Sequence, residues 1–372
     1  MSKSSSLKKD FSARASWVNY RSSAIFPFFL GACEDTLLVF QNYWQWKSKI
    51  ENLIANIFVR DLNGKLIHSE SLQIDTHNQI SIKNILSDAE DIDKGTVEIE
   101  VIGNKNLGYP FPAILCYYKS KDYISVVHSA GRILNSNEDH QTNTWRESNF
   151  LSIFDDNLSP FISIFNGQDA MNTELSIKFL KLPVKDLILE KKFPLELNPF
   201  GSKIFYANEF LDDSEKKLVK GKRFFIEFEH ENKGIFGRYV VGNYFKKANM
   251  HFCTHSFMSV TESGDIIESS KENPITSFLP AFNKKPLNLR LISYPTNIKS
   301  NVTFKSKEAN IDEIIEQDTD NIFNFNSGEE AFEGELTEDK FVKFYSTDHC
   351  PARLNISYNF SLPNSKHPTD IA

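Results

Sequence analysis

Residues 117–129 read YYKSKDYISVVHS and residues 244–256 read YFKKANMHFCTHS, and the two stretches align without a gap at an offset of 127. They share a tyrosine, a lysine and a terminal His-Ser pair: Tyr117/Tyr244, Lys119/Lys246, His128/His255 and Ser129/Ser256. VEIE at 97–100 likewise matches IEFE at 226–229. Solenoid repeats have periods of roughly 20–50 residues, so this longer spacing predicts a whole domain copied in tandem.

The repeat divides the chain into a flexible N-terminal segment at 1–21, module one at 22–133, module two at 149–260 and a divergent third β module at 276–364. The third module rests on a short match, the Pro-Ala-x-Leu pattern of 112–115 and 351–354. Polar stretches at 134–148 and 261–274 are rich in Ser, Asn, Thr and Glu, which is typical of linkers.

Each module reads as β structure. In 96–101 Val97, Ile99 and Val101 alternate with polar residues, and 173–179 shows the same period of two, which places one set of side chains on a core face and the other in water. Asn63-Gly64 between two apolar runs is a strong hairpin signal. The segments 83–92 and 208–221 are predicted as short helical connections. With roughly seven or eight such runs per module, the predicted fold is all-β, a tandem of immunoglobulin-like or jelly-roll-like β-sandwiches.

Charge and targeting signals narrow the class of protein. The net charge of -7 argues against nucleic acid as a partner, because phosphate binding needs a basic face. Residues 309–339 hold eleven acidic side chains and no Lys or Arg, which predicts an acidic loop. Within it, DTDNIF at 318–323 begins like a calcium-binding loop but lacks the required glycine. No signal peptide, no membrane span of roughly 18 apolar residues and no paired cysteine framework are found, so we expect a cytoplasmic protein. The oligomeric state stays open.

The stretch HFCTH is the sharpest candidate for a metal site. On a strand His251, Cys253 and His255 point to one face, where two imidazoles and a thiolate could hold a transition metal. The matching residues of module one are Ile124, Val126 and His128, however, and this apolar pattern favours packed core over a metal site. No P-loop, GxGxxG or HExxH motif is present, so no cofactor is predicted.

Aromatic residues at 43–46 are the candidate for ligand binding. If this segment is extended, Trp44 and Trp46 share a face, and Tyr43 lies beside them. Flat aromatic rings can stack on sugar faces or anchor a partner protein. Core packing is the competing interpretation.

Two functions from different classes follow. The first is a non-enzymatic protein that binds a glycan or protein partner, or serves as a structural or assembly component, since tandem modules multiply weak contacts. The alternative is a metal- or carboxylate-dependent enzyme with a site between modules near His128 and His255. Binding predicts an exposed Trp44/Trp46 face and buried, hydrogen-bonded histidines, whereas catalysis predicts that His255 opens to a cleft near a carboxylate or metal.

Overall fold

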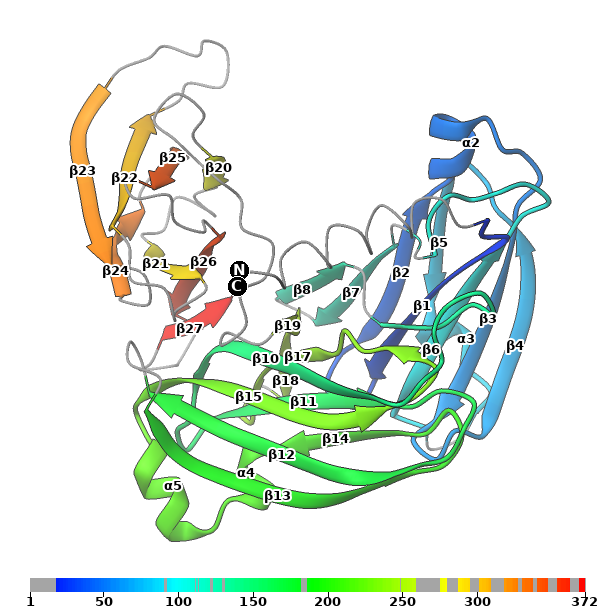
Figure 1. Cartoon of the computed structure of the whole chain (residues 1–372), viewed down its shortest axis with the longest axis horizontal. Helices are drawn as coiled ribbons and strands as arrows, with labels where there is room; N and C mark the ends of the chain where they lie inside the picture. The colour runs from blue at the N-terminus through cyan, green and yellow to red at the C-terminus, as the bar shows by residue number, and fades with distance from the viewer. Residues whose placement is uncertain are drawn as a thin grey trace.

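A computed structural model describes residues 18–258, apart from 90–91, 111, 113, 121–122, 129–130, 182–185 and 248, and beyond residue 258 it describes strand backbones alone. The chain consists mainly of β-strands in several antiparallel sheets, with a few short helices (Figure 1). The prediction of an all-β fold is therefore confirmed. None of the helices in the part described is long and apolar enough to cross a membrane.

Eight strands, β1–β8, form what we call the first unit. Two four-stranded sheets have the orders β1-β6-β3-β4 and β5-β2-β7-β8. Helix α2 follows β2, and helix α3 follows β5. The bounds are β1 Arg21–Phe29, β2 Asp35–Gln41, α2 Tyr43–Ser48, β3 Ile54–Asp61, β4 Leu66–Gln73, β5 His77–Ser81, α3 Ile82–Ile85, β6 Lys94–Ile102, β7 Ile114–Ser120 and β8 Tyr123–His128.

The second unit begins at Asn143, inside the segment expected to be a linker. Its sheets have the orders β13-β12-β15-β10-β19 and β14-β11-β17-β18, and the short strand β9 (Arg132–Ile133) pairs with β16 (Ile235–Phe236). The bounds are β10 Asn143–Ile153, β11 Leu158–Phe165, β12 Met171–Lys181, β13 Leu187–Leu197, β14 Ser202–Tyr206, α4 Ala207–Phe210, α5 Asp213–Val219, β15 Arg223–Asn232, β17 Val240–Phe245, β18 Met250–His255 and β19 Phe257–Met258.

Strands β20–β27 have the orders β20-β25-β22-β23 and β24-β21-β26-β27. Two of them, β23 and β24, lie within residues 309–339, so the expectation of an acidic loop is wrong for those stretches. The bounds are β20 Ile275–Leu279, β21 Leu287–Tyr294, β22 Asn301–Glu308, β23 Asp318–Asn326, β24 Glu330–Leu336, β25 Lys340–Ser346, β26 Arg353–Ser361 and β27 Pro368–Ile371.

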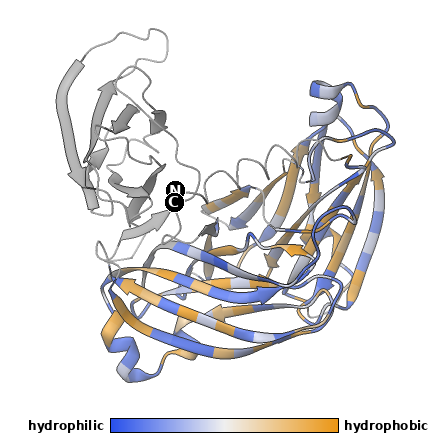
Figure 2. Ribbon diagram, viewed as in Figure 1, coloured by the Kyte–Doolittle hydropathy of each residue, from blue (hydrophilic) through white to orange (hydrophobic). Residues whose placement is uncertain are grey.

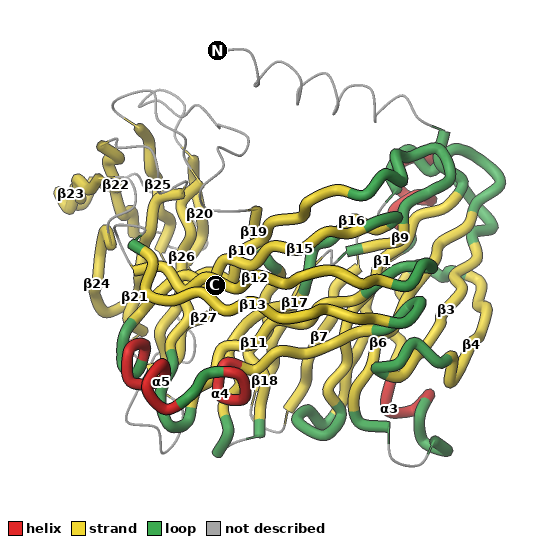
Figure 3. The backbone as a smooth tube through the Cα atoms, turned by 60° about the horizontal axis from the view of Figure 1, so that its bottom comes forward, coloured by secondary structure: helices red, strands yellow, loops and turns green. Residues whose placement is uncertain are grey.

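Strand order recurs along the chain. Ranked along the sequence, with the short β9, β16 and β19 set aside, all three runs of eight strands give the orders 1-6-3-4 and 5-2-7-8. The pairing register differs, because Tyr117 lies opposite Val126 whereas Tyr244 lies opposite His251, two residues away from the gapless alignment. The longer β17–β18 connection accounts for this slip. Helices α3 and α4 follow the fifth strand of their runs and remain short connections between long strands (Figure 3).

The hydrophobic cores join the first two units. One cluster draws on both sheets of the first unit and also includes Phe161, Tyr206, Val240 and Cys253 of the second unit. The other cluster fills the second unit and includes Ile25 from β1. Apolar and polar residues alternate along many strands, as Figure 2 shows by colour. The two units therefore share buried surface, which fixes how one lies on the other.

The predicted hairpin at Asn63-Gly64 is present and contacts the second unit. Gly64 has a φ of 84°, which favours glycine. A Cβ atom at Gly64 would lie 2.1 Å from the carbonyl oxygen of Pro199. The amide of Ser202 donates to the carbonyl of Leu62 at 2.9 Å. The hairpin thus closes β3 onto β4 and also docks on the turn before β14.

Candidate functional site

Residues 43–48 form helix α2, so the expectation of an extended strand is wrong here. The Asn42 side chain caps the helix by accepting from the amide of Gln45 at 3.1 Å, and Lys49 ends it in the left-handed region. Residues two apart on a helix point to different sides. Trp44 is accordingly buried at 2% exposure, whereas Trp46 is 77% exposed. Trp44 anchors the helix, and Trp46 stands in solvent.

A different set of side chains gathers around Trp46. Tyr43 and Trp46 lie three residues apart on the helix, and Tyr43 and Lys47 four apart, so all three share a face. The Lys47 ammonium donates to the Tyr43 hydroxyl at 2.6 Å and lies 5.7 Å from the ring centre of Tyr109, which is 46% exposed. We call Tyr43, Trp46, Lys47 and Tyr109 the aromatic tip. Helix α2 lies at the end of the first unit remote from the strands of the second unit (Figure 1).

His251, the first residue of HFCTH, is packed within the core. Its ring stacks on Phe29 with centroids 4.1 Å apart, and its Nε2 atom lies 2.8 Å from the Tyr206 hydroxyl. Burial, and secondarily the charge of Lys94, lowers the pKa of His251 to about 3. Cys253 is buried too, and burial raises the pKa of its thiol. Both residues serve the contact between the two units.

The two histidines of the repeat meet each other. The rings of His128 and His255 form an edge contact with centroids 4.7 Å apart. Beside them the Ser125 hydroxyl donates to the Cys253 carbonyl and accepts from its amide, both at 2.7 Å, which ties β8 to β18. Burial, and then the charge of Arg238, lowers the pKa of His128. Among the described residues no group of three or more His, Cys, Asp or Glu side chains could hold a metal ion.

The serine that follows His255 has a structural contact of its own. The Ser256 hydroxyl accepts from the amide of Tyr239 at 2.9 Å, and Ser256 is fully buried. Nearby Glu147 is 4% exposed, and burial raises its pKa to about 7 against the lowering effects of Ser256, Arg238 and Trp145. An acid with such a pKa changes charge near neutral pH. Ser129, the partner of Ser256 in the repeat, lies outside the described residues.

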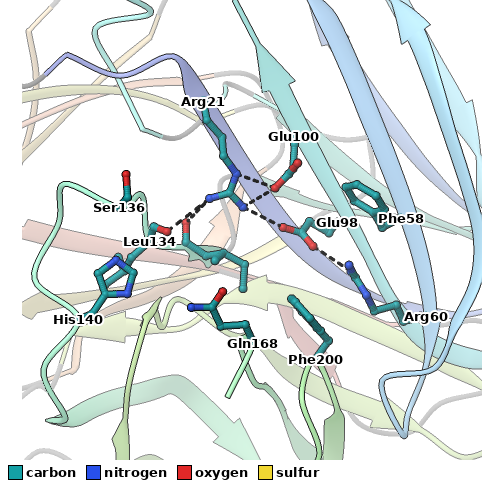
Figure 4. Close-up of a pocket in the computed structure, with 11 residues that line it drawn as sticks. Arg21, Phe58, Arg60, Glu98, Glu100, Leu134, Ser136, His140, Gln168 and Phe200 are labelled. Carbon is teal, nitrogen blue, oxygen red and sulfur yellow. Dashed lines mark hydrogen bonds and ion pairs between the residues drawn. The ribbon is translucent and has the colours of Figure 1, made fainter. Parts of the chain in front are cut away.

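A cavity of about 370 Å³ lies between the first two units. Strands β1, β3 and β6 supply its charged wall, and residues 133–140 together with Gln168 and Phe200 cover it (Figure 4). Its lining includes three aromatic or imidazole rings and several polar side chains: Arg21, Phe58, Arg60, Glu98, Glu100, Ile133, Leu134, Ser136, His140, Gln168 and Phe200. We call this cavity the inter-unit pocket.

Four charged side chains form a network in the wall of the inter-unit pocket. Arg60 donates to Glu98 at 2.8 Å, and Arg21 donates to Glu100 at 2.6 Å through Nε and to Glu98 at 3.3 Å. The Glu98 side chain is 3% exposed, and burial raises its pKa, although both arginines oppose the rise. Figure 4 shows the network as a continuous row. The pairing keeps charge in a place that is mostly shielded from water.

Aromatic rings hold Arg60 in place. Its guanidinium carbon lies 4.3 Å from the ring centre of Phe200 and 5.1 Å from that of Phe58. Phe58 lies on β3 and Phe200 lies in the second unit, so the Arg60 guanidinium contacts one aromatic ring from each unit. The orientation of this arginine therefore depends on the way the units meet.

Sequence reasoning did not single out the residues of the inter-unit pocket. Of the pocket residues, Glu98 and Glu100 belong to the repeated VEIE segment, but the alternation there predicted that both face water. Thr96 and Glu98 are in fact buried, at 3% and 2% exposure, because the second unit covers that face of the sheet. Val97, Ile99 and Val101 do face the core, as predicted.

No family model, no curated protein and no solved structure matches this chain.

Proposed function

We propose that this chain is a non-enzymatic binding protein composed of tandem β-sandwiches, and that its aromatic tip binds a glycan. The architecture draws support from the recurring strand order and from cores that draw on both sheets of a unit. Tandem units raise the effective concentration of weak binding sites along an extended ligand.

The observation that carries the proposal is the exposure of Trp46. A tryptophan that is 77% exposed contributes nothing to the core, yet its helix is fixed by buried Trp44 and by caps at both ends. A flat ring in a fixed position can stack on the apolar face of a sugar. Lys47 beside it carries N–H donors for hydroxyl groups, and Tyr109 adds a second exposed ring.

A protein partner is the competing occupant. Protein hot spots lie in well-packed pockets that exclude water, whereas Trp46 stands on an open surface. An open ring of this kind suits a glycan better.

A glycan array probed with the full chain tests the proposal. We expect binding to at least one glycan class and a loss of at least tenfold, about 1.4 kcal/mol, in Trp46→Ala. Leu187→Ala is a matched control, since Leu187 is 54% exposed and lies on β13, away from the tip. An array with no bound glycan, or equal losses in both variants, would contradict the proposal.

A further inference from the structure

The charges of the inter-unit pocket cancel. Arg21 and Arg60 face Glu98 and Glu100, and each charged group has a partner of opposite sign within hydrogen-bond distance. An incoming anion would be attracted by the arginines and repelled by the carboxylates, and a cation would meet the reverse. A purely apolar ligand would strip water from these groups without replacing its hydrogen bonds, which is costly. The pocket therefore disfavours anions, cations and purely apolar molecules as ligands.

We propose that the inter-unit pocket binds a neutral polyhydroxylated molecule of about the size of a single sugar. Carboxylates accept hydrogen bonds and guanidinium groups donate them, so the Arg60 guanidinium and the Glu100 carboxylate in the pocket lining can serve the hydroxyl groups of such a ligand as donor and acceptor. The volume of about 370 Å³ lies near the lower end of the range of roughly 300–1,000 Å³ for small-molecule sites.

The cover of the pocket adds neutral polar groups and apolar area. Gln168 and Ser136 are exposed side chains at the rim, and their amide and hydroxyl groups can both donate and accept. His140 uses one ring nitrogen, Nε2, toward the carbonyl of Asn135 at 2.7 Å. Phe58 and Phe200 are half-buried and supply apolar surface for the ring carbons of a sugar.

This site is separate from the aromatic tip. Its lining comes from β1, β3 and β6, from residues 133–140, and from Gln168 and Phe200 of the second unit, and it includes no residue of α2. Its volume suits a single small molecule, whereas the tip is an exposed surface. The proposal therefore stands without the proposed function, and the two can fail independently.

Saturation-transfer NMR and calorimetry on the full chain test the pocket. The probes are D-glucose, D-galactose, D-mannose and N-acetyl-D-glucosamine, together with glucuronate as an anionic and glucosamine as a cationic counterpart. We expect at least one neutral sugar to bind and the charged counterparts to bind at least tenfold more weakly. Absence of binding by all neutral sugars, or equal binding of the charged ones, would overturn the proposal.

Variants locate the binding. Ser136→Trp fills the pocket from its rim without removing a buried contact, and we expect it to abolish sugar binding. Ser87→Trp places the same side chain on an exposed position after α3, outside the pocket, and should leave binding intact. Gln168→Ala should weaken binding severalfold, and Trp46→Ala should leave it unchanged. Retained binding in Ser136→Trp, or its loss in Trp46→Ala, would show that the sugar sits elsewhere.

Discussion

Strands β6 and β12 carry the same alternation of apolar and polar residues and lie in opposite surroundings. On both strands the alternating apolar side chains of the pattern, such as Ile99 on β6 and Ile177 on β12, are completely buried. On β12 the polar side faces water, where Glu174 pairs with Lys192 and both side chains are more than half exposed. On β6 the polar side is covered by the second unit, and Glu98 pairs with Arg60 almost out of contact with solvent.

This difference shows that a pattern of period two fixes which side chains face their own core and leaves open what covers the other side. The covering of β6 depends on residues such as Phe200, about a hundred positions further along the chain. A charged pair at such a place becomes costly to disturb, because an ion left alone in a buried site loses its hydration and its partner together. The inter-unit pocket exists only because the two units meet there.

The largest expected effect comes from breaking the buried pair. Arg60→Ala leaves Glu98 with Arg21 alone and removes the stacking on Phe58 and Phe200, so we expect a loss of about 3 kcal/mol in the free energy of unfolding. Urea denaturation followed by circular dichroism measures it.

Lys192→Ala, on β13, is the matched variant for the ion pair that Lys192 forms with Glu174 of β12. Its partner stays in water after the substitution, so the urea midpoint should not move measurably. Equal shifts of the urea midpoint in Arg60→Ala and Lys192→Ala would mean that the second unit does not shield the Glu98–Arg60 pair from water.

The first strands of the two units, β1 and β10, differ in the residue that faces the core at matching positions. Ala24 of β1 lies opposite Ile99, and Glu147 of β10 lies opposite Phe228, at matching places of VEIE and IEFE. Burial holds the pKa of Glu147 at about 7 instead of the ordinary 4.5. The folded state therefore retains a proton that the unfolded state has lost, and stability falls as the pH rises from about 4.5 to about 7.

Glu147→Gln should abolish that loss. Above pH 7 we expect the variant to be more stable than the natural chain by up to about 3 kcal/mol, and near pH 4 the two should differ little. Urea denaturation at a series of pH values measures the difference between the two proteins. Parallel curves across the whole range would contradict a raised pKa for Glu147.

The elements that sequence reasoning predicted depend on neighbours close in the chain. The alternation on β6 and β12 and the Asn63-Gly64 turn need only a few adjacent residues, and the structure contains them. Helix α2 was missed because QNYWQWKSK is a short, strongly aromatic run, which favours a strand by composition alone. Asn42 at its start is a helix-capping residue that could have indicated the helix.

The inter-unit pocket could not be predicted in the same way. Its residues come from segments separated by up to about 180 positions, and nothing in a single sequence states how one unit lies on another. The period-two alternation in 96–101 also misled, because it implied that Glu98 and Glu100 face water. The two units share a strand order. Each unit nevertheless contributes different residues to the surface between them, so the repeat does not predict that surface.

The smallest expected effect is the response of the two ion pairs to salt. Double-mutant cycles with Glu98→Gln and Arg60→Met, and with Glu174→Gln and Lys192→Met, isolate the coupling within each pair. The Debye length shrinks from about 10 Å at 0.1 M salt to about 3 Å at 1 M, but mobile ions screen only charges that they can approach. The coupling between Glu174 and Lys192 should therefore vanish in 1 M NaCl, while that between Glu98 and Arg60 should persist. If 1 M NaCl lowered both coupling energies equally, salt ions would be reaching Glu98 and Arg60 freely. The polar sides of β6 and β12 would then be equally exposed to solvent.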